Sequence, residues 1–166
     1  MLFRSGVSDG LEGNLISGNE GPGISSDGEP VTQTVIAGNI IGAAVGGTSI
    51  LANSGAGIDF GNDAKHNRIG GSKAVERNVI SGNEGGGIRI TGAGSVQNWI
   101  AGNLIGVDVA GAVALANGGE GIALLGAVQN IIGTNGDGNG DATEGNVISG
   151  NYIGIKLVGG GSHVVA

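Results

Sequence analysis

The chain has 166 residues, enough for one domain or one run of stacked repeats, and 39 of them are glycine while only 2 are proline. Collagen needs far more proline and a strict glycine period, and frequent Ile, Val and Leu with only 13% charged residues exclude a disordered chain. A net charge of −7 argues against nucleic acid or an anionic membrane as partner, no apolar run reaches transmembrane length, and zero cysteines exclude disulfides and thiolate metal sites.

A short motif of Asn, any residue, Ile, a small residue and Gly recurs along the chain. It occurs, with some variation, as NLISG (14–18), TVIAG (34–38), NRIGG (67–71), NVISG (78–82), NWIAG (98–102), NIIGT (130–134) and NVISG (146–150). A second element, Gly followed by alternating apolar residues, occurs as GIDF (57–60), GIRI (87–90), GVDV (106–109), GIALL (121–125) and GIKL (154–157). These segments are too short for helices and are bounded by Gly and Asn, so the sequence predicts short β-strands.

The motifs return with a period of about 64 residues. Asn14 to Asn78 and Thr34 to Asn98 are both 64 positions apart, and only the step from Asn78 to Asn146 is longer, at 68. Such a superrepeat indicates stacked units that bury their apolar faces against one another. Three coils of about 20 residues or two of about 32 both fit this period.

Gly and Asn at the strand ends have a physical reason. A strand that bends sharply into the next needs a residue with positive φ, which Gly adopts freely and Asn tolerates. An Asn in the same corner of successive coils can also hydrogen-bond to the backbone above and below. The sequence therefore predicts an all-β parallel β-solenoid, a single domain over residues 1–166 with its repeats from about 13 to 160.

The combined pattern NVISGN…GIxI…N-x-I-x-GN-x-IG resembles the right-handed parallel β-helix repeats of bacterial surface and secreted proteins, which are grouped with the pectate-lyase-like superfamily. The resemblance implies a right-handed coil and a secreted or cell-surface location as part of a longer protein, although MLFRSGVSDGLEG (1–13) does not read as a signal peptide. The chain begins and stops almost in repeat, which predicts a fragment with uncapped ends that invite self-association.

Strand alternation separates an inner from an outer face. The constant Ile of the first motif should point inward, and we expect the charged residues of the second to point outward: Asp59, Arg89, Asp108 and Lys156. In lyases and hydrolases of this fold, catalytic residues of these types stand outward on one sheet, so the resemblance implies an enzyme as the alternative. Outward charges also keep an exposed strand soluble, and no carboxylates are closely paired, so we favour a face with no catalytic residue.

The middle position of the first motif is mostly aliphatic although it should face outward: Leu15, Val35, Arg68, Val79, Trp99, Ile131 and Val147. Loops at 42–52 and 106–116 are long enough to cover this row. If it is uncovered, it predicts self-association of the chain or stacking of a sugar ring on Trp99. His66 and His163 lie in no catalytic or zinc-binding pattern and are expected at the surface.

The superrepeat is lengthened by TNGDGNGDATEGN (134–146), which places Asp137, Asn139 and Asp141 at alternate positions, with Glu144 three residues further on. Oxygen ligands separated by single flexible residues suit a hard cation, so the insert predicts a calcium site, with a solvated acidic turn as the simpler interpretation. The chain otherwise requires no cofactor.

Together these features predict a non-enzymatic structural or polysaccharide-binding β-helix module of an extracellular or surface bacterial protein. The alternative is a polysaccharide lyase or glycoside hydrolase fragment that uses the outward Asp, Arg and Lys residues. Loss of activity on acidic polysaccharides in an Arg89→Ala variant would favour this alternative.

Overall fold

The computed structural model of the chain describes residues 13–26, 28, 30–61 and 63–166, which form a parallel β-solenoid. Its short strands build three five-stranded parallel sheets, and each sheet takes one strand from each successive coil. Sheet 1 contains β1 (Leu15–Ile16), β4 (Ile40–Ile41), β7 (Val79–Ile80), β10 (Leu104–Ile105) and β13 (Val147–Ile148). Sheet 2 contains β2 (Ile24–Ser25), β5 (Ile58–Phe60), β8 (Ile88–Thr91), β11 (Glu120–Leu125) and β14 (Ile153–Val158). Sheet 3 contains β3 (Val35–Ile36), β6 (Arg68–Gly70), β9 (Trp99–Ala101), β12 (Ile131–Ile132) and β15 (Val164–Val165).

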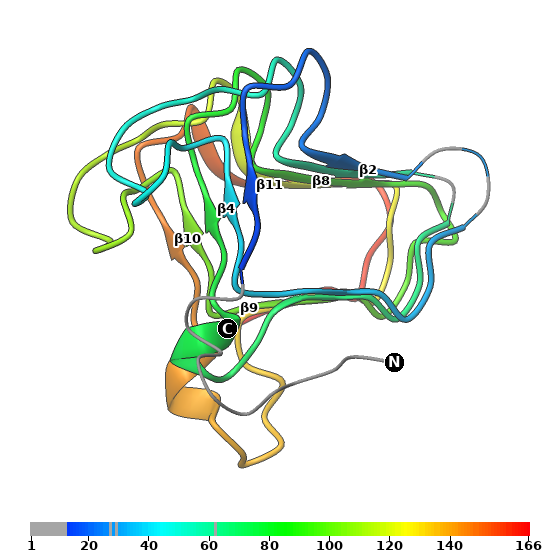
Figure 1. Cartoon of the computed structure of the whole chain (residues 1–166). Helices are drawn as coiled ribbons and strands as arrows, with labels where there is room; N and C mark the ends of the chain where they lie inside the picture. The colour runs from blue at the N-terminus through cyan, green and yellow to red at the C-terminus, as the bar shows by residue number, and fades with distance from the viewer. Residues whose placement is uncertain (1–12, 27, 29, 62) are drawn as a thin grey trace.

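Figure 1 looks along the axis of the solenoid. Sheets 2 and 3 lie opposite each other, sheet 1 closes one end between them, and the turns that lead from sheet 2 to sheet 3 close the other end. The predicted all-β parallel solenoid is therefore confirmed. The right-handed coil implied by the resemblance stays an expectation, in keeping with the strong preference of parallel crossover connections for that hand.

The sheet registers define how the superrepeat divides into coils. In sheet 3, paired residues of successive coils are 31 to 33 positions apart. In sheet 1, the row Leu15, Ile40, Val79, Leu104 and Val147 advances by 25, 39, 25 and 43 positions. The 64-residue period is thus two coils of unequal length, and the three-coil interpretation is wrong.

The additional residues form loops on both sides of sheet 1 (Figure 1). Between sheets 1 and 2, loops 42–57 and 106–119 each contain a short antiparallel bridge, which joins Ala43 to Ile50 and Val107 to Ala114. Between sheets 3 and 1, loops 71–78 and 133–146 each contain a 3-10 turn, η2 (Ala74–Glu76) and η3 (Asp141–Thr143). Every second coil therefore carries an enlarged corner on each side of sheet 1.

The interior is filled mainly by isoleucine from all three sheets, as the alternation predicts. The inward Ile of the first motif belongs to this core at all seven positions, fully buried at the centre and half-buried in the outer coils: Ile16, Ile36, Ile69, Ile80, Ile100, Ile132 and Ile148. Ile58, Ile88 and Ile122 from sheet 2 are fully buried as well. Side chains of one shape stacked at each level fill a narrow interior closely and leave little void.

Three ladders of asparagine lie beside the strands, one before sheet 1, one between sheets 1 and 2, and one before sheet 3. In each ladder, the backbone N–H or the side-chain Nδ2 of an Asn donates to the Oδ1 atom of the ladder residue one coil further on. The same Nδ2 also donates to a backbone carbonyl of a neighbouring coil. The ladders are Asn14, Asn39, Asn78, Asn103 and Asn146; Asn19, Asn53, Asn83, Asn117 and Asn151; and Thr34, Asn67, Asn98, Asn130 and His163. The predicted hydrogen-bonding role of the corner Asn is confirmed, because these side chains satisfy backbone groups where the strands end. None of the described non-glycine residues with positive φ is an Asn, so the expected left-handed role of Asn at the corners is wrong.

The two histidines differ in their surroundings. His66 is exposed, as expected. His163 is half-buried and continues the third ladder, since its Nδ1 atom accepts a hydrogen bond from the backbone N–H of Asn130 at 3.2 Å. His163 is therefore only partly exposed, and it occupies the corner position that Thr34 holds in one coil and Asn67, Asn98 and Asn130 hold in three others.

Candidate functional site

Three of the predicted charged residues stand on the outer face of sheet 2. Register pairs Asp59 with Arg89, and Ala123 connects Arg89 to Lys156 in the same row across the strands. Two hydrogen bonds of 3.0 Å join the Arg89 guanidinium to both carboxylate oxygens of Asp59. Lys156 donates to Glu120 at 2.7 Å. The row is therefore composed of ion pairs at the surface.

Asp108 does not belong to this row. The GVDV segment is one arm of loop 106–119, and Val107 packs against Val79 and Leu104 outside sheet 1 and not in the central core. The Oδ1 atom of Asp108 accepts hydrogen bonds from the backbone N–H groups of Ala112 (2.8 Å) and Val113 (3.0 Å). The prediction that Asp108 shares a face with the other three residues is wrong. GVDV (106–109) has the same local pattern as the strand segment GIDF (57–60), but it belongs to a loop.

The superrepeat contained the signal that identifies this loop. Gly106 lies 64 positions after Gly42, where loop 42–57 begins, and not 64 positions after the Gly of a sheet 2 strand. Position in the superrepeat is thus a better guide to structure here than the resemblance of four residues.

Asp108 makes the stability of loop 106–119 depend on pH. Hydrogen bonds from the backbone N–H groups of Val113 and Ala112 lower the pKa of Asp108 below its ordinary value of 3.8. The carboxylate therefore stabilises the fold above the ordinary pKa, and this contribution is lost as the pH falls through the lower, folded-state pKa. We expect the Tm of Asp108→Asn to fall less between pH 5 and pH 2 than that of the unmodified protein. Two parallel curves of Tm against pH would contradict this role.

A shallow groove of about 360 Å³ runs beside the charged row of sheet 2. Its charged lining residues are Asp59, Glu84, Arg89 and Glu120, and glycines at 55, 85, 86, 118 and 119 supply much of the rest. Sequence reasoning missed Glu120, which is the first residue of β11 and holds Lys156. The hydrogen bond from Lys156 lowers the pKa of Glu120, so at neutral pH this carboxylate is ionised and cannot act as a proton donor.

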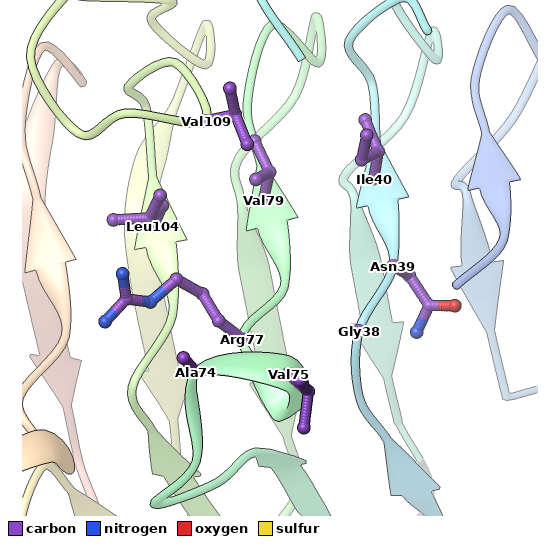
Figure 2. A pocket seen from close by; sticks show the side chains of 9 residues that line it. All are labelled: Gly38, Asn39, Ile40, Ala74, Val75, Arg77, Val79, Leu104 and Val109. Carbon is purple, nitrogen blue, oxygen red and sulfur yellow. The ribbon is translucent and has the colours of Figure 1, made fainter. Parts of the chain in front are cut away.

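A second groove, also of about 360 Å³, lies over the outer face of sheet 1 (Figure 2). Ile40, Val79 and Leu104 form its floor, one from each of three adjacent strands. The turn of loop 71–78 forms one wall with Ala74, Val75 and Arg77, and Val109 of loop 106–119 stands on the opposite side. The floor is thus apolar and the groove is bounded by the loops of alternate coils.

Arg77 is the one charged residue among the described residues that line this groove. Its side chain is exposed and extends towards β10, where its Nε atom donates to the carbonyl of Gly102 at 3.0 Å. This bond fixes the direction of the guanidinium, whose other donors can bind a carboxylate or hydroxyl group in the groove.

The predicted aliphatic row is divided between two sheets. Leu15, Val79 and Val147 lie on sheet 1, and the other four members lie on sheet 3. The centre of sheet 1 is covered as predicted for loop 106–116, since Val79 and Leu104 are buried against Val107. Leu15 and Val147 in the outer coils are exposed. Self-association through this row or through the ends of the solenoid stays a prediction.

Trp99 lies on sheet 3, where it is half-buried between Arg68 and Ile131 of the adjacent strands. Its indole Nε1 atom donates to the carbonyl of Gly133 at 2.9 Å. The polar atom of the ring is therefore engaged within the chain, and sugar stacking on Trp99 stays a prediction. This contact also places the indole beside the start of loop 133–146.

Three of the four predicted calcium ligands come together in loop 133–146. One carboxylate oxygen each of Asp137, Asp141 and Glu144 lies within 4.8 Å of the other two. Asn139 is an exposed neighbour of Asp137, to whose Oδ1 atom its backbone N–H donates at 2.7 Å.

Comparison of the chain with protein family models, with curated proteins and with solved structures finds no match. Within the part of the chain that the structure describes, no helix has the length and hydrophobicity needed to cross a bilayer. The two grooves and the charged residues are therefore the features of the chain that bear on its function.

Proposed function

We propose that this chain is a non-catalytic β-solenoid module that binds polysaccharide along the groove over sheet 1. We further propose that it serves within an extracellular or surface protein of bacteria and is related to the pectate-lyase-like β-helix proteins that its repeats resemble. The observation that supports binding most directly is the groove itself, with its apolar floor and a fixed Arg77 at one wall (Figure 2).

The chemistry of this groove suits a sugar acid. Val79 and Leu104 are buried beneath the groove. The accessible apolar side chains of Ile40, Val75 and Val109 can pack against the apolar face of a sugar ring. The guanidinium of Arg77 has donors left for a carboxylate after its bond to Gly102. Because the whole chain carries a net charge of −7, long-range electrostatics oppose the approach of an acidic polysaccharide, and recognition depends on these short contacts.

The alternative enzyme has one observation in its favour, the groove lined by Asp59, Glu84, Arg89 and Glu120. The ion pairs count against it, because Asp59 is bound by Arg89, and Lys156 by Glu120. A lyase or hydrolase needs a base or acid that is ready to exchange a proton with the substrate. We therefore propose binding as the function and catalysis as the second candidate.

Affinity for acidic and neutral polysaccharides, measured by calorimetry and affinity electrophoresis, tests the proposal. We expect Arg77→Ala to weaken binding of an acidic polysaccharide about tenfold or more, because a charge-assisted hydrogen bond contributes about 1.5–3 kcal/mol. The matched control is Arg89→Ala, which removes an exposed arginine from sheet 2 and should leave affinity unchanged.

Three outcomes would contradict the proposal. Binding that is lost in Arg89→Ala and kept in Arg77→Ala would move the site to sheet 2. New reducing ends or unsaturated products that disappear in Arg89→Ala would establish the enzyme. Absence of binding to every polysaccharide tested would leave a structural role.

A further inference from the structure

Loops 71–78 and 133–146 are equivalent elements two coils apart. Glu76 and Glu144 each lie two residues before an Asn of the same ladder, Asn78 and Asn146. The carbonyl of Glu76 accepts the N–H of Gly38, and the carbonyl of Glu144 accepts the N–H of Gly102. In both loops a backbone N–H near the start of the loop donates to the Oε2 atom of the Glu, from Lys73 in one and from Asn135 in the other. The two side chains thus occupy the same place in the fold.

The two glutamates differ in the charge that faces them. Arg68 of β6 forms an ion pair with Glu76, with its NH1 nitrogen 3.3 Å from Oε1. The residue equivalent to Arg68 two coils further on is Ile131 of β12, as the register through Trp99 shows. Glu144 therefore occupies the place of Glu76 without the arginine that balances it.

The carboxylate of Glu144 is buried and one of its oxygens is unsatisfied. The residue is 1% exposed, and its Oε1 atom has no hydrogen-bond partner among the residues that the structure describes. The Oδ1 atom of Asp141 is buried and unpartnered in the same sense. A buried carboxylate oxygen without a cation or donor carries a large desolvation cost, which a bound cation or a proton on the carboxyl group relieves.

The insert adds acidic groups to this site and no basic one. Asp137 and Asp141 bring their carboxylates to within 4.8 Å of that of Glu144, and none of the ion pairs among the described residues includes these three groups. Calcium binds oxygen ligands at about 2.3–2.6 Å, so two ligands of one ion can lie up to about 5 Å apart. We propose that loop 133–146 binds a calcium ion through Asp137, Asp141 and Glu144, in the role that Arg68 has beside Glu76.

Hydrogen bonds within the loop leave one oxygen of each buried ligand for the ion. Oδ2 of Asp141 accepts the N–H of Gly138, and Oε2 of Glu144 accepts the N–H of Asn135, so the unpartnered atoms are Oδ1 and Oε1. Calcium is favoured over magnesium, because a flexible carboxylate-rich loop fits its variable coordination, whereas magnesium retains most of its water. The calcium site shares no residue with the lining of the sheet 1 groove, and it can be tested without any polysaccharide.

Terbium luminescence and thermal melting test the site directly. Trp99 is the single tryptophan of the chain and donates to Gly133 at the start of the loop, so excitation of its indole should sensitise a terbium ion bound there. We expect calcium to displace terbium and to raise the Tm by about 5 °C at saturation relative to chelator-treated protein. The double variant Asp137→Asn/Asp141→Asn should lose both effects, while the control Glu84→Gln, in an exposed glutamate, should keep them.

A substitution that restores the arginine provides a second, independent test. Ile131→Arg should place a guanidinium beside Glu144 as Arg68 lies beside Glu76, so we expect calcium affinity to fall at least tenfold and the Tm to become independent of calcium. Failure of terbium to bind the unmodified protein, a Tm unchanged by calcium, or unchanged calcium affinity in Ile131→Arg would each overturn the proposal.

Discussion

Replacing Asn98 with alanine should lower the free energy of unfolding by about 4 kcal/mol, since the side chain serves groups in three coils. Its Oδ1 atom accepts the backbone N–H and the Nδ2 of Asn67, and its Nδ2 donates to the carbonyl of Ala64 and to Asn130. Asn98 is fully buried, so no water reaches the groups that alanine leaves unpaired. Each buried polar group left without a partner costs about 1–3 kcal/mol. Chemical denaturation followed by circular dichroism measures the loss.

The control for this substitution is Asn19→Ala at the first position of another ladder. Asn19 is exposed and donates to Asn53, so its removal should cost less than about 1 kcal/mol. Equal losses in the two variants would show that the ladder does not derive its strength from burial.

Gly70→Ala should destabilise the fold by more than about 3 kcal/mol or prevent folding, through a clash between coils. Gly70 has a φ of +86°, and a Cβ atom there would lie 2.0 Å from the carbonyl oxygen of Ala101 in the next coil. That oxygen accepts the N–H of Gly71, so the strands cannot separate without breaking a hydrogen bond of the sheet. The loss is measured by denaturant titration, or by the yield of soluble protein if folding fails.

Gly126→Ala is the control that distinguishes the effect of a clash between coils from the effect of backbone strain. Gly126 also has a positive φ, of +73°, but a Cβ atom there meets nothing within 4 Å. Its substitution should cost about 1–2 kcal/mol, the usual penalty for a left-handed residue with a side chain. If both variants lose the same stability, the contact between coils does not account for the effect at Gly70.

The inner face and the corners could be predicted because both follow from local chemistry repeated at each coil. Ile80 and Ile100 lie inward because side chains alternate along a strand, and this holds whatever the length of the loops. Asn78 and Asn98 lie at corners because their side chains replace backbone partners where a strand ends. Such features depend on only a few adjacent residues, so the sequence predicts them.

The division into coils could not be predicted, since it depends on pairing between distant residues. Loops 42–57 and 71–78 extend one coil to 39 residues in sheet 1, yet they contain Gly, Val and Ile in the same local patterns as strands. Asp108 was predicted on sheet 2 because its loop carries the local pattern of a strand. The register shows which Gly-Val or Gly-Ile step enters a sheet, and position in the superrepeat then identifies its equivalents in other coils.

The candidate sites were predictable to different extents. The placement of Asp137, Asp141 and Glu144 within one insert predicted their convergence, because a short glycine-rich loop can bring its side chains together, whereas the alternate position of Asn139 did not bring it to the cluster. The missing arginine beside Glu144 could not be found in this way. Arg68 and Ile131 hold the same position in the sequence motif, but the ion pair between Arg68 and Glu76 joins a strand to a loop and is shown only by the structure. The pairing of Glu120 with Lys156 likewise joins residues 36 positions apart.

The unequal coils have a consequence for the outer surface. Strands in a sheet are spaced by about 4.8 Å, so equivalent loops recur about every 10 Å along the axis, one for each two-coil unit. The loops that flank sheet 1 thus form a one-dimensional array along the axis, in which equivalent enlarged corners alternate with short ones. Lengthening the chain by one 64-residue unit would add one further enlarged loop on each side of sheet 1. A polymer that lies along the axis would contact these loops at a constant interval.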